Sequence, residues 1–206
     1  MKKLEFVSAG LANDPEYNSL GFRCKEFDDI DFDNYIIFAG SSHVEGIGVE
    51  KDQTFAHLVS EVLECDHVNL GVGGGGIDAV EHNVLMWFMK YDKHPKEIVI
   101  EWPIYQRFVK DEYGEENLCR GGSWSDPRFV TYADHPLYIK GEMAYRNLHK
   151  LLPVKITDVM HGKISSYTWN SSVIWHCKDD IGSDGEHPGP KSHLKTSENI
   201  LEVLNR

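Results

Sequence analysis

The chain has 206 residues, enough for one domain with a substantial core, and no shift in composition marks a second domain. Its 33 acidic and 21 basic residues give a net charge of -12. This balance argues against nucleic acid or an anionic membrane surface as the main partner, because both favour clustered Lys and Arg. We therefore expect a single domain over residues 1–206 that binds neither nucleic acid nor a membrane.

The cysteines and the N-terminus bear on the cellular compartment. No Cys-x-x-Cys spacing is present, so neither a zinc site nor a dense disulfide framework is indicated, and free thiols are expected for Cys24, Cys65, Cys119 and Cys177. The positive start of the chain lacks the long apolar core of a signal peptide, and no later run is long and apolar enough to span a bilayer. We expect a cytoplasmic protein; nothing in the sequence indicates its oligomeric state.

The first clear element is an apolar run over residues 35–39, which predicts a buried strand. The 33 residues before it are assigned to an N-terminal extension (1–33) in which no chemistry is apparent. The run leads into Gly-Ser-Ser-His-Val-Glu-Gly over residues 40–46. A buried strand that ends in a glycine-flanked serine places the hydroxyl, here that of Ser42, at the carboxyl edge of a sheet, where α/β proteins build their sites.

Helices and strands then alternate at short intervals. Hydrophobic spacing predicts a helix over residues 55–63 with Asp52 or Thr54 as its cap, a strand over 67–70, a helix over 77–91 and a strand over 97–102. This order is typical of a parallel sheet with helices on its faces, connected by right-handed crossovers. The fold class is therefore α/β.

The second half of the chain has weaker signals. Residues 103–140 are rich in Gly, Asp, Pro and aromatic residues, and we expect a long insertion or a lid-like segment there. A helix is predicted over residues 141–152, with Leu151 on its apolar stripe, and a last inner strand over residues 173–175. In the final helix, Leu194, Leu201 and Leu204 are expected to pack inward.

Three segments could carry chemistry. The hydroxyl of Ser42 is a poor nucleophile at neutral pH unless a base removes its proton. The spacing of Asp184 and His187 lets the carboxylate reach Nδ1 of the ring and leaves Nε2 free to face a serine. The glycine run over residues 71–76 can present backbone N–H groups near a helix N-terminus to a developing oxyanion.

Structural roles and other kinds of binding site stay open for the same residues. Ser42 could be a helix cap, and the glycine run could be a flexible turn or a dinucleotide-binding loop, although no ribose-binding acid is well placed. A metal site built from Asp184, His187 and His193 matches no compact ligand motif. His43 is adjacent to Ser42, but neighbouring side chains on an extended backbone point apart, which favours a place in the pocket wall.

The first of these segments resembles the opening block of the SGNH, or GDSL-type, hydrolase family, and the resemblance covers most of the chain. That block reads Gly-Asp-Ser, and residues 40–46 match it except that Ser41 stands where Asp is usual. The resemblance implies that Ser42 is the nucleophile. Residues 18–23 also resemble a leader segment that precedes this block in some members.

Two further segments resemble later blocks of the family. Residues 69–74 look like the second block, whose last glycine implies an oxyanion N–H at Gly74. Residues 184–189 are similar to the final Asp-x-x-His-Pro-Gly block, which implies that His187 is the base and Asp184 its orienting partner.

The third block is where the chain departs from the family. Gly-x-Asn-Asp is expected after the third strand, with the Asn side chain donating to the oxyanion, but residues 101–107 read Glu-Trp-Pro-Ile-Tyr-Gln-Arg. Tyr105 falls near the missing Asn, and Gln106 or Arg107 could supply a donor in its place. Loss of one oxyanion donor costs about a hundredfold to a thousandfold in rate.

The resemblance implies a three-layer α/β/α fold with a short parallel sheet, in the flavodoxin-like arrangement of SGNH hydrolases. It also implies hydrolysis of a carboxylic ester, such as an acyl-sugar or a small lipid-like ester, without a cofactor. His43, Trp102 and Arg107 are candidates for the pocket, and core packing is the other role expected for Trp102. The missing Asn, together with Ser41, favours an alternative, a non-catalytic module of the same fold that binds a glycan or a partner protein through the long middle segment.

Overall fold

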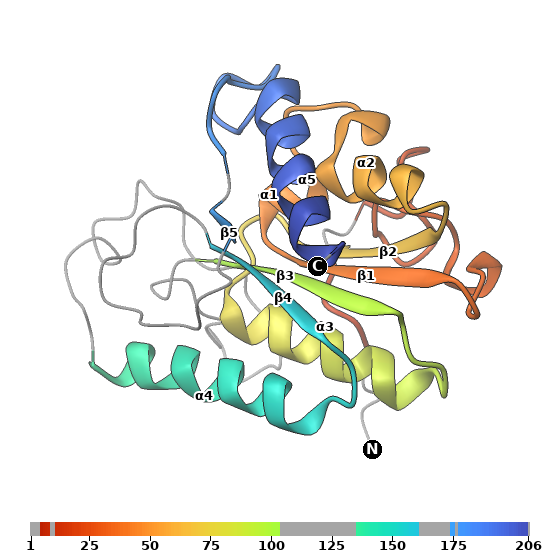
Figure 1. Ribbon diagram of the computed structural model, residues 1–206, viewed down its shortest axis with the longest axis vertical. Helices are drawn as coiled ribbons and strands as arrows, with labels where there is room; N and C mark the ends of the chain where they lie inside the picture. The colour runs from red at the N-terminus through yellow and green to blue at the C-terminus, as the bar shows by residue number, and fades with distance from the viewer. Residues whose placement is uncertain (1–4, 9–10, 104–134, 161–173, 176, 206) are drawn as a thin grey trace.

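A computed structural model describes residues 5–8, 11–103, 135–160, 174–175 and 177–205 (Figure 1). Its centre is a five-stranded parallel sheet in the order β2-β1-β3-β4-β5. The strands are β1 (Tyr35–Gly40), β2 (Asp66–Gly71), β3 (Glu97–Trp102), β4 (Ile156–Met160) and β5 (Ile174–Trp175). The first three were predicted, whereas β4 was not, and β5 lies at the edge of the sheet rather than in its interior.

The helices form a layer on each face of this sheet (Figure 1). They are α1 (Ser42–Glu45), α2 (Phe55–Val62), α3 (Ile77–Lys90), α4 (His135–Leu151) and α5 (Pro190–Leu204), with short 3-10 helices η1 (Phe27–Asp29) and η2 (Lys51–Gln53). Helices α3 and α4 contribute to one apolar core, and α2 and α5 contribute to the other. The three-layer α/β/α fold is therefore confirmed.

Strand β1 shows why an uninterrupted apolar run forms a central strand. Successive side chains of a strand point to opposite faces, so a strand covered on both faces needs apolar residues at every position. Ile37 packs in the core with α3 and α4, and Ile36 and Phe38 pack in the core with α2 and α5. All six residues of β1 are buried, which fixes the point at which the chain leaves the sheet edge.

The last two helices differ from their predicted form. Helix α4 begins at His135, inside the segment assigned to an insertion. Leu151 is 63% exposed and Leu194 is 50% exposed, so the prediction that they pack inward is wrong. The inner face of α5 instead consists largely of polar residues, because small or hydrogen-bonded side chains fit close to the sheet there: Ser192, His193, Thr196, Ser197 and Ile200 are buried.

Part of the segment assigned to an N-terminal extension belongs to the core on the α3 side. Phe22 and Phe27 are buried with ring centroids 5.4 Å apart, and Phe27 lies 5.0 Å from the ring of Trp87 on α3. The chain therefore reaches β1 after crossing the α3 face, where it can contact the ends of the strands.

Two observations concern the membrane and the thiols. None of the helices in the described part of the chain is long and apolar enough to cross a membrane. Three of the four cysteines, Cys24, Cys65 and Cys177, are free, as predicted, and Cys119 lies outside the described residues.

Two histidines, the half-buried His67 and the buried His193, make the stability of the fold sensitive to acid. Burial is the main cause that lowers the pKa of each imidazole from 6.5 to about 4. Between these values the unfolded chain binds a proton that the folded chain does not, so the free energy of unfolding falls as the pH drops from 6.5 to about 4. The expected slope is at most about 1.4 kcal/mol per pH unit for each histidine.

Urea unfolding at pH 7, 6 and 5 measures this slope. His193→Asn keeps an acceptor for the backbone N–H of Phe55, which His193 Nδ1 binds at 3.1 Å, and should remove about half of the slope. An equal slope in the wild type and the variant would contradict the assignment.

Candidate active site

Ser42 is the first residue of helix α1, directly after the carboxyl end of β1. Ser41 holds the N-cap position, and the helix ends at Gly46 in the left-handed conformation, with φ of 83°. The expectation that Ser42 could be a helix cap is therefore wrong. Its side chain instead belongs to a turn packed at the sheet edge, and Ser42 is only 3% exposed.

The structure brings Ser42, His187 and Asp184 into one hydrogen-bonded chain. His187 Nε2 lies 3.0 Å from Ser42 Oγ, and His187 Nδ1 lies 2.5 Å from Asp184 Oδ2. Partial burial raises the pKa of Asp184, but the hydrogen bonds from the His187 ring and from two backbone N–H groups outweigh it and hold the pKa below its ordinary value. Asp184 is thus a carboxylate at neutral pH that can fix the orientation and tautomer of the ring.

The loop that carries Asp184 and His187 is held by its own backbone. The N–H of Gly182 donates to the carbonyl of His187 at 2.7 Å, and Ile181 and Pro188 form an antiparallel bridge. Asp184 Oδ1 accepts from the N–H of His187 at 3.1 Å. Asp184 therefore contacts both the backbone and the ring of His187, and the contact with Nδ1 is the one that the spacing of three residues predicted.

This loop docks on the segment that follows α1. The N–H of Ser183 donates to the carbonyl of Gly48 at 2.8 Å. Gly48 has φ of 90°, and a Cβ there would lie 2.8 Å from Asp184 Oδ1. On the other side, Asp180 accepts from the N–H groups of Lys191 and Ser192 at the start of α5. The Asp184/His187 loop is thus fixed between Gly48 and α5.

If His187 is the base that the sequence resemblance implies, Gly48→Ala should lower ester turnover about a hundredfold, because the new methyl group displaces Asp184 and with it His187. Gly185→Ala is the matched control. Gly185 also has a positive φ, of 78°, but nothing lies within 4 Å of a Cβ built there. Both variants should lose about 1–2 kcal/mol of stability from backbone strain, measured by urea unfolding, whereas only Gly48→Ala should lose turnover. Equal turnover in the two variants would contradict this account.

The glycine run lies against α1 and is fixed by a buried carboxylate. Glu45, 2% exposed, accepts from the N–H of Gly73 through Oε2 and from the hydroxyl of Tyr17, at 2.8 Å, through Oε1. Gly74 follows with φ of 72°. A carboxylate that already occupies Gly73 would repel a pyrophosphate, which argues against the dinucleotide-binding alternative. Within the described part of the chain, the backbone N–H groups of Ser42 and Gly74 have no recorded acceptor.

The N-terminal segment supports the same turn through Arg23, which is 6% exposed. Its guanidinium donates to the carbonyl of Gly46 at 2.5 Å and to that of Val49 at 2.9 Å, and it pairs with Glu16. The sequence indicated no chemistry in this segment on physical grounds. The one signal was the resemblance of residues 18–23 to a leader segment, and Arg23 is its last residue.

Tyr17→Phe removes a hydrogen bond to the buried carboxylate of Glu45 and is expected to lower the free energy of unfolding by about 1.5–3 kcal/mol. Burial, and next the charge of Glu45, raise the pKa of the Tyr17 hydroxyl above its ordinary value, so it stays a donor. Tyr35→Phe is a comparison in which no charged group takes part, since Tyr35 donates to the carbonyl of Lys93 at 2.7 Å and accepts from Nε1 of Trp87 at 3.2 Å. A free energy of unfolding in Tyr17→Phe equal to that of the wild type, by urea unfolding, would contradict the expectation for Tyr17.

The remaining predicted residues have different places. Trp102 is 1% exposed and packs in the core, with its Nε1 donating to Asp158 at 2.8 Å, so core packing is the role that the structure shows. His43 lies on a helical turn, so the prediction that it points away from Ser42 because the backbone is extended is wrong. Its ring stands edge-on to that of His187, with ring centroids 5.8 Å apart. Three predicted residues, Tyr105, Gln106 and Arg107, lie outside the described residues.

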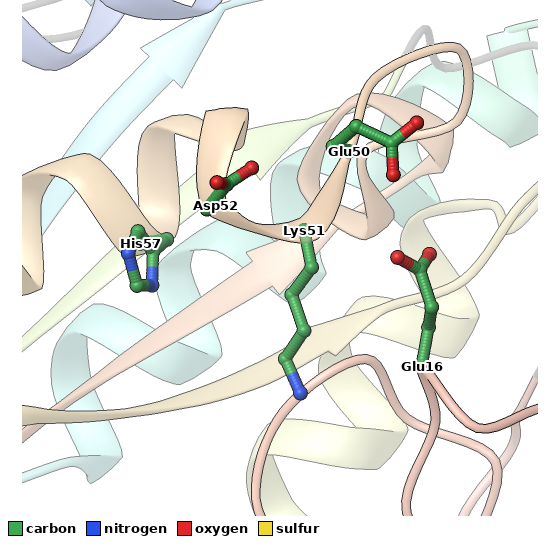
Figure 2. A pocket seen from close by; sticks show the side chains of 5 residues that line it. All are labelled: Glu16, Glu50, Lys51, Asp52 and His57. Atoms are coloured by element: carbon green, nitrogen blue, oxygen red, sulfur yellow. The ribbon is translucent and has the colours of Figure 1, made fainter.

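Two further features are the metal site considered for Asp184, His187 and His193, and a hollow on the surface. In the parts of the chain that the structure describes, no three His, Cys, Asp or Glu side chains are grouped as metal ligands. A hollow of about 380 Å³ opens beside η2 and α2 (Figure 2), and its side chains come from Glu16, Glu50, Lys51, Asp52 and His57. The described residues that line this hollow do not include Ser42, Asp184 or His187.

No protein-family model matches the sequence, and a comparison with curated proteins found no match. Solved structures share its fold at low identity. An acetyl xylan esterase from the rumen bacterium Butyrivibrio proteoclasticus is 15% identical with a TM-score of 0.51, over 84% of this chain and 63% of that one. A carbohydrate esterase whose active site is described as having divergent catalytic and non-catalytic binding functions is 14% identical with a TM-score of 0.52, over 84% and 64%.

A third structure, described as TesA, is 12% identical with a TM-score of 0.53, and the match covers 82% of this chain and 97% of that one. The chain thus spans less than two thirds of the two carbohydrate esterases and nearly all of TesA. The fold is that of the SGNH, or GDSL-type, hydrolases, as the resemblance predicted.

Proposed function

We propose that the protein is an esterase that hydrolyses a carboxylic ester with Ser42 as nucleophile. The single observation that carries this proposal is the 3.0 Å contact between His187 Nε2 and Ser42 Oγ, in a ring whose other nitrogen binds Asp184. A serine hydroxyl becomes a nucleophile when a base of this kind takes its proton. The esterases that share the fold support the proposal.

In the proposed reaction, Ser42 Oγ bonds to the carbonyl carbon while its proton passes to His187 Nε2. The N–H groups of Ser42 and Gly74 would bind the oxyanion of the tetrahedral intermediate. As the bond to the leaving oxygen breaks, His187 returns the proton to the alcohol, and an acyl-Ser42 ester remains. Water, deprotonated by His187, then attacks this ester and releases the carboxylic acid and the free hydroxyl of Ser42.

The proposed substrate is an acyl-sugar or a small lipid-like ester. The first choice is supported by the two carbohydrate esterases among the structural neighbours. Tyr105, Gln106 and Arg107 remain the candidates for a further oxyanion donor, and no cofactor is required by this route.

Turnover of p-nitrophenyl acetate and labelling by an organophosphonate test the proposal together. The wild type should release p-nitrophenolate, and mass spectrometry of the labelled protein should locate one phosphonyl group on the peptide that contains Ser42. Labelling of a different residue, or turnover that survives when Ser42 is labelled, would contradict it.

A second function is favoured by the absence of Asn from residues 101–107 and by Ser41. The protein would then be a non-catalytic module that binds a glycan or a partner protein, and one structural neighbour is described as having both catalytic and non-catalytic binding functions. Calorimetric titration with acetylated xylo-oligosaccharides separates the two: binding without release of acetate supports the module, and release of acetate supports the esterase.

A further inference from the structure

A second buried carboxylate, that of Glu101, contacts both residues that flank Ser42. Glu101 lies near the end of β3 and is 0% exposed. Its Oε2 accepts from the N–H of Ser41 at 3.1 Å and from the hydroxyl of Ser41 at 3.0 Å. Its Oε1 lies 3.3 Å from Nδ1 of His43. One side chain from the neighbouring strand therefore holds the residues on either side of the candidate nucleophile.

The position of Glu101 is tightly determined. A Cβ added to Gly40 would lie 2.8 Å from the carbonyl oxygen of Glu101 and 2.9 Å from its Oε2, so β1 and β3 approach closely where the chain turns into α1. A carboxylate buried at such a place is costly unless hydrogen bonds and a nearby cation or dipole compensate it. Two hydrogen bonds from Ser41 supply part of that compensation, and they couple the carboxylate to the orientation of the first turn of α1.

Position 41 is where residues 40–46 depart from the Gly-Asp-Ser pattern, and Ser41 contacts Glu101 directly. An aspartate there would bring a second buried carboxylate against the first, since the serine oxygen is already 3.0 Å from Glu101 Oε2. Two carboxylates at this distance repel each other and one of them must take up a proton. A serine at this position donates a hydrogen bond instead.

We propose that Glu101 is a positioning residue for Ser42 and that it supplies, from β3, the carboxylate that the Gly-Asp-Ser pattern places at position 41. It acts through Ser41 and His43 and does not touch the reacting atoms. The expected effect on kinetics rests on the proposed esterase function. The structural part of the inference does not rest on it: a carboxylate at position 101 takes the place of the one that the pattern has at position 41.

The kinetic test compares Glu101→Gln with Glu97→Gln. Glutamine keeps the shape of the side chain but removes its charge and replaces one acceptor oxygen with an NH₂ group, whereas Ser41 donates to the carboxylate through both its N–H and its hydroxyl. Glu97 is a matched control, because it lies on the same strand, is 8% exposed and pairs with Lys155 at 3.3 Å, away from Ser42. We expect Glu101→Gln to lower kcat for p-nitrophenyl acetate about a hundredfold with KM unchanged, and Glu97→Gln to keep kcat. Equal kcat in the two variants would overturn the positioning role.

The structural test is a double-mutant cycle of Ser41→Asp and Glu101→Gln, followed by urea unfolding. Ser41→Asp alone should lower the unfolding midpoint, and the double variant should unfold at a higher urea concentration than Ser41→Asp, with part of kcat recovered. Additive effects of the two substitutions would overturn the exchange. If the wild type itself has no turnover, the esterase proposal fails, and the unfolding cycle still decides whether Glu101 takes the place of an acid at position 41.

Discussion

Ser42→Ala is expected to reduce ester turnover to the uncatalysed background. Removal of a serine nucleophile that acts with a base costs about a millionfold in kcat, because no covalent intermediate can form and the proton accepted by His187 has no donor. The fold should be retained, since the hydroxyl of Ser42 has one recorded hydrogen bond among the described residues, to His187. Turnover of p-nitrophenyl acetate at saturating substrate is the measurement.

Ser60→Ala is the matched control for this loss. Ser60 is 3% exposed, like Ser42, and its hydroxyl also lies near a histidine nitrogen, 2.9 Å from His67 Nδ1. It lies on α2, so its removal should leave kcat unchanged. Comparable activity in Ser42→Ala and Ser60→Ala would exclude Ser42 as the nucleophile.

Asp184→Asn is expected to lower kcat by about ten-thousandfold. The asparagine side chain fits the same space, but its NH₂ group can face His187 Nδ1 and so favour the tautomer that carries its proton on Nε2. That nitrogen could then no longer accept the proton of Ser42. The effect should appear in kcat rather than in KM, because substrate binding does not depend on the tautomer.

Glu186→Gln removes one negative charge from the same loop and is the control for Asp184→Asn. The side chain of Glu186 is exposed, and only its backbone N–H contacts Asp184, at 3.1 Å. We expect its kcat to equal that of the wild type. A similar loss in both variants would mean that net loop charge, and not the orientation of His187, supports the reaction.

Apolar runs explain how much of the fold could be predicted. Strands β1, β2 and β3 were found because apolar residues occupy most of their inner positions, and the buried glutamates of β3, Glu97 and Glu101, lie outside its apolar centre. Strand β4 was missed because Thr157 and Asp158 interrupt its pattern. Both are buried and satisfied by distant partners: Trp102 and His149 bind Asp158, and Glu97 accepts from Thr157. A sequence window cannot reveal partners that only the tertiary fold brings together.

The candidate site also has contacts that the sequence predicts and contacts that it does not. Asp184 and His187 are three residues apart, so their contact is a local property that their spacing predicts. The supports of the site are not local: Tyr17 reaches Glu45, and Glu101 reaches Ser41 from another strand. Buried carboxylates are uncommon without such partners. The sequence alone indicated neither whether Glu45 and Glu101 are exposed to solvent nor what role they have.

The docking of the Asp184/His187 loop on Gly48 has a consequence for the order of folding. Ser42 and His187 are 145 residues apart in the sequence, and a contact across so long a chain forms after local strand and helix units because its closure entropy is larger. During synthesis, the hydroxyl of Ser42 emerges well before the segment that carries its proposed base. If Ser42 is the nucleophile proposed above, it is inert in a partly folded chain that lacks His187 beside it, and it gains reactivity when the Asp184/His187 loop docks on Gly48.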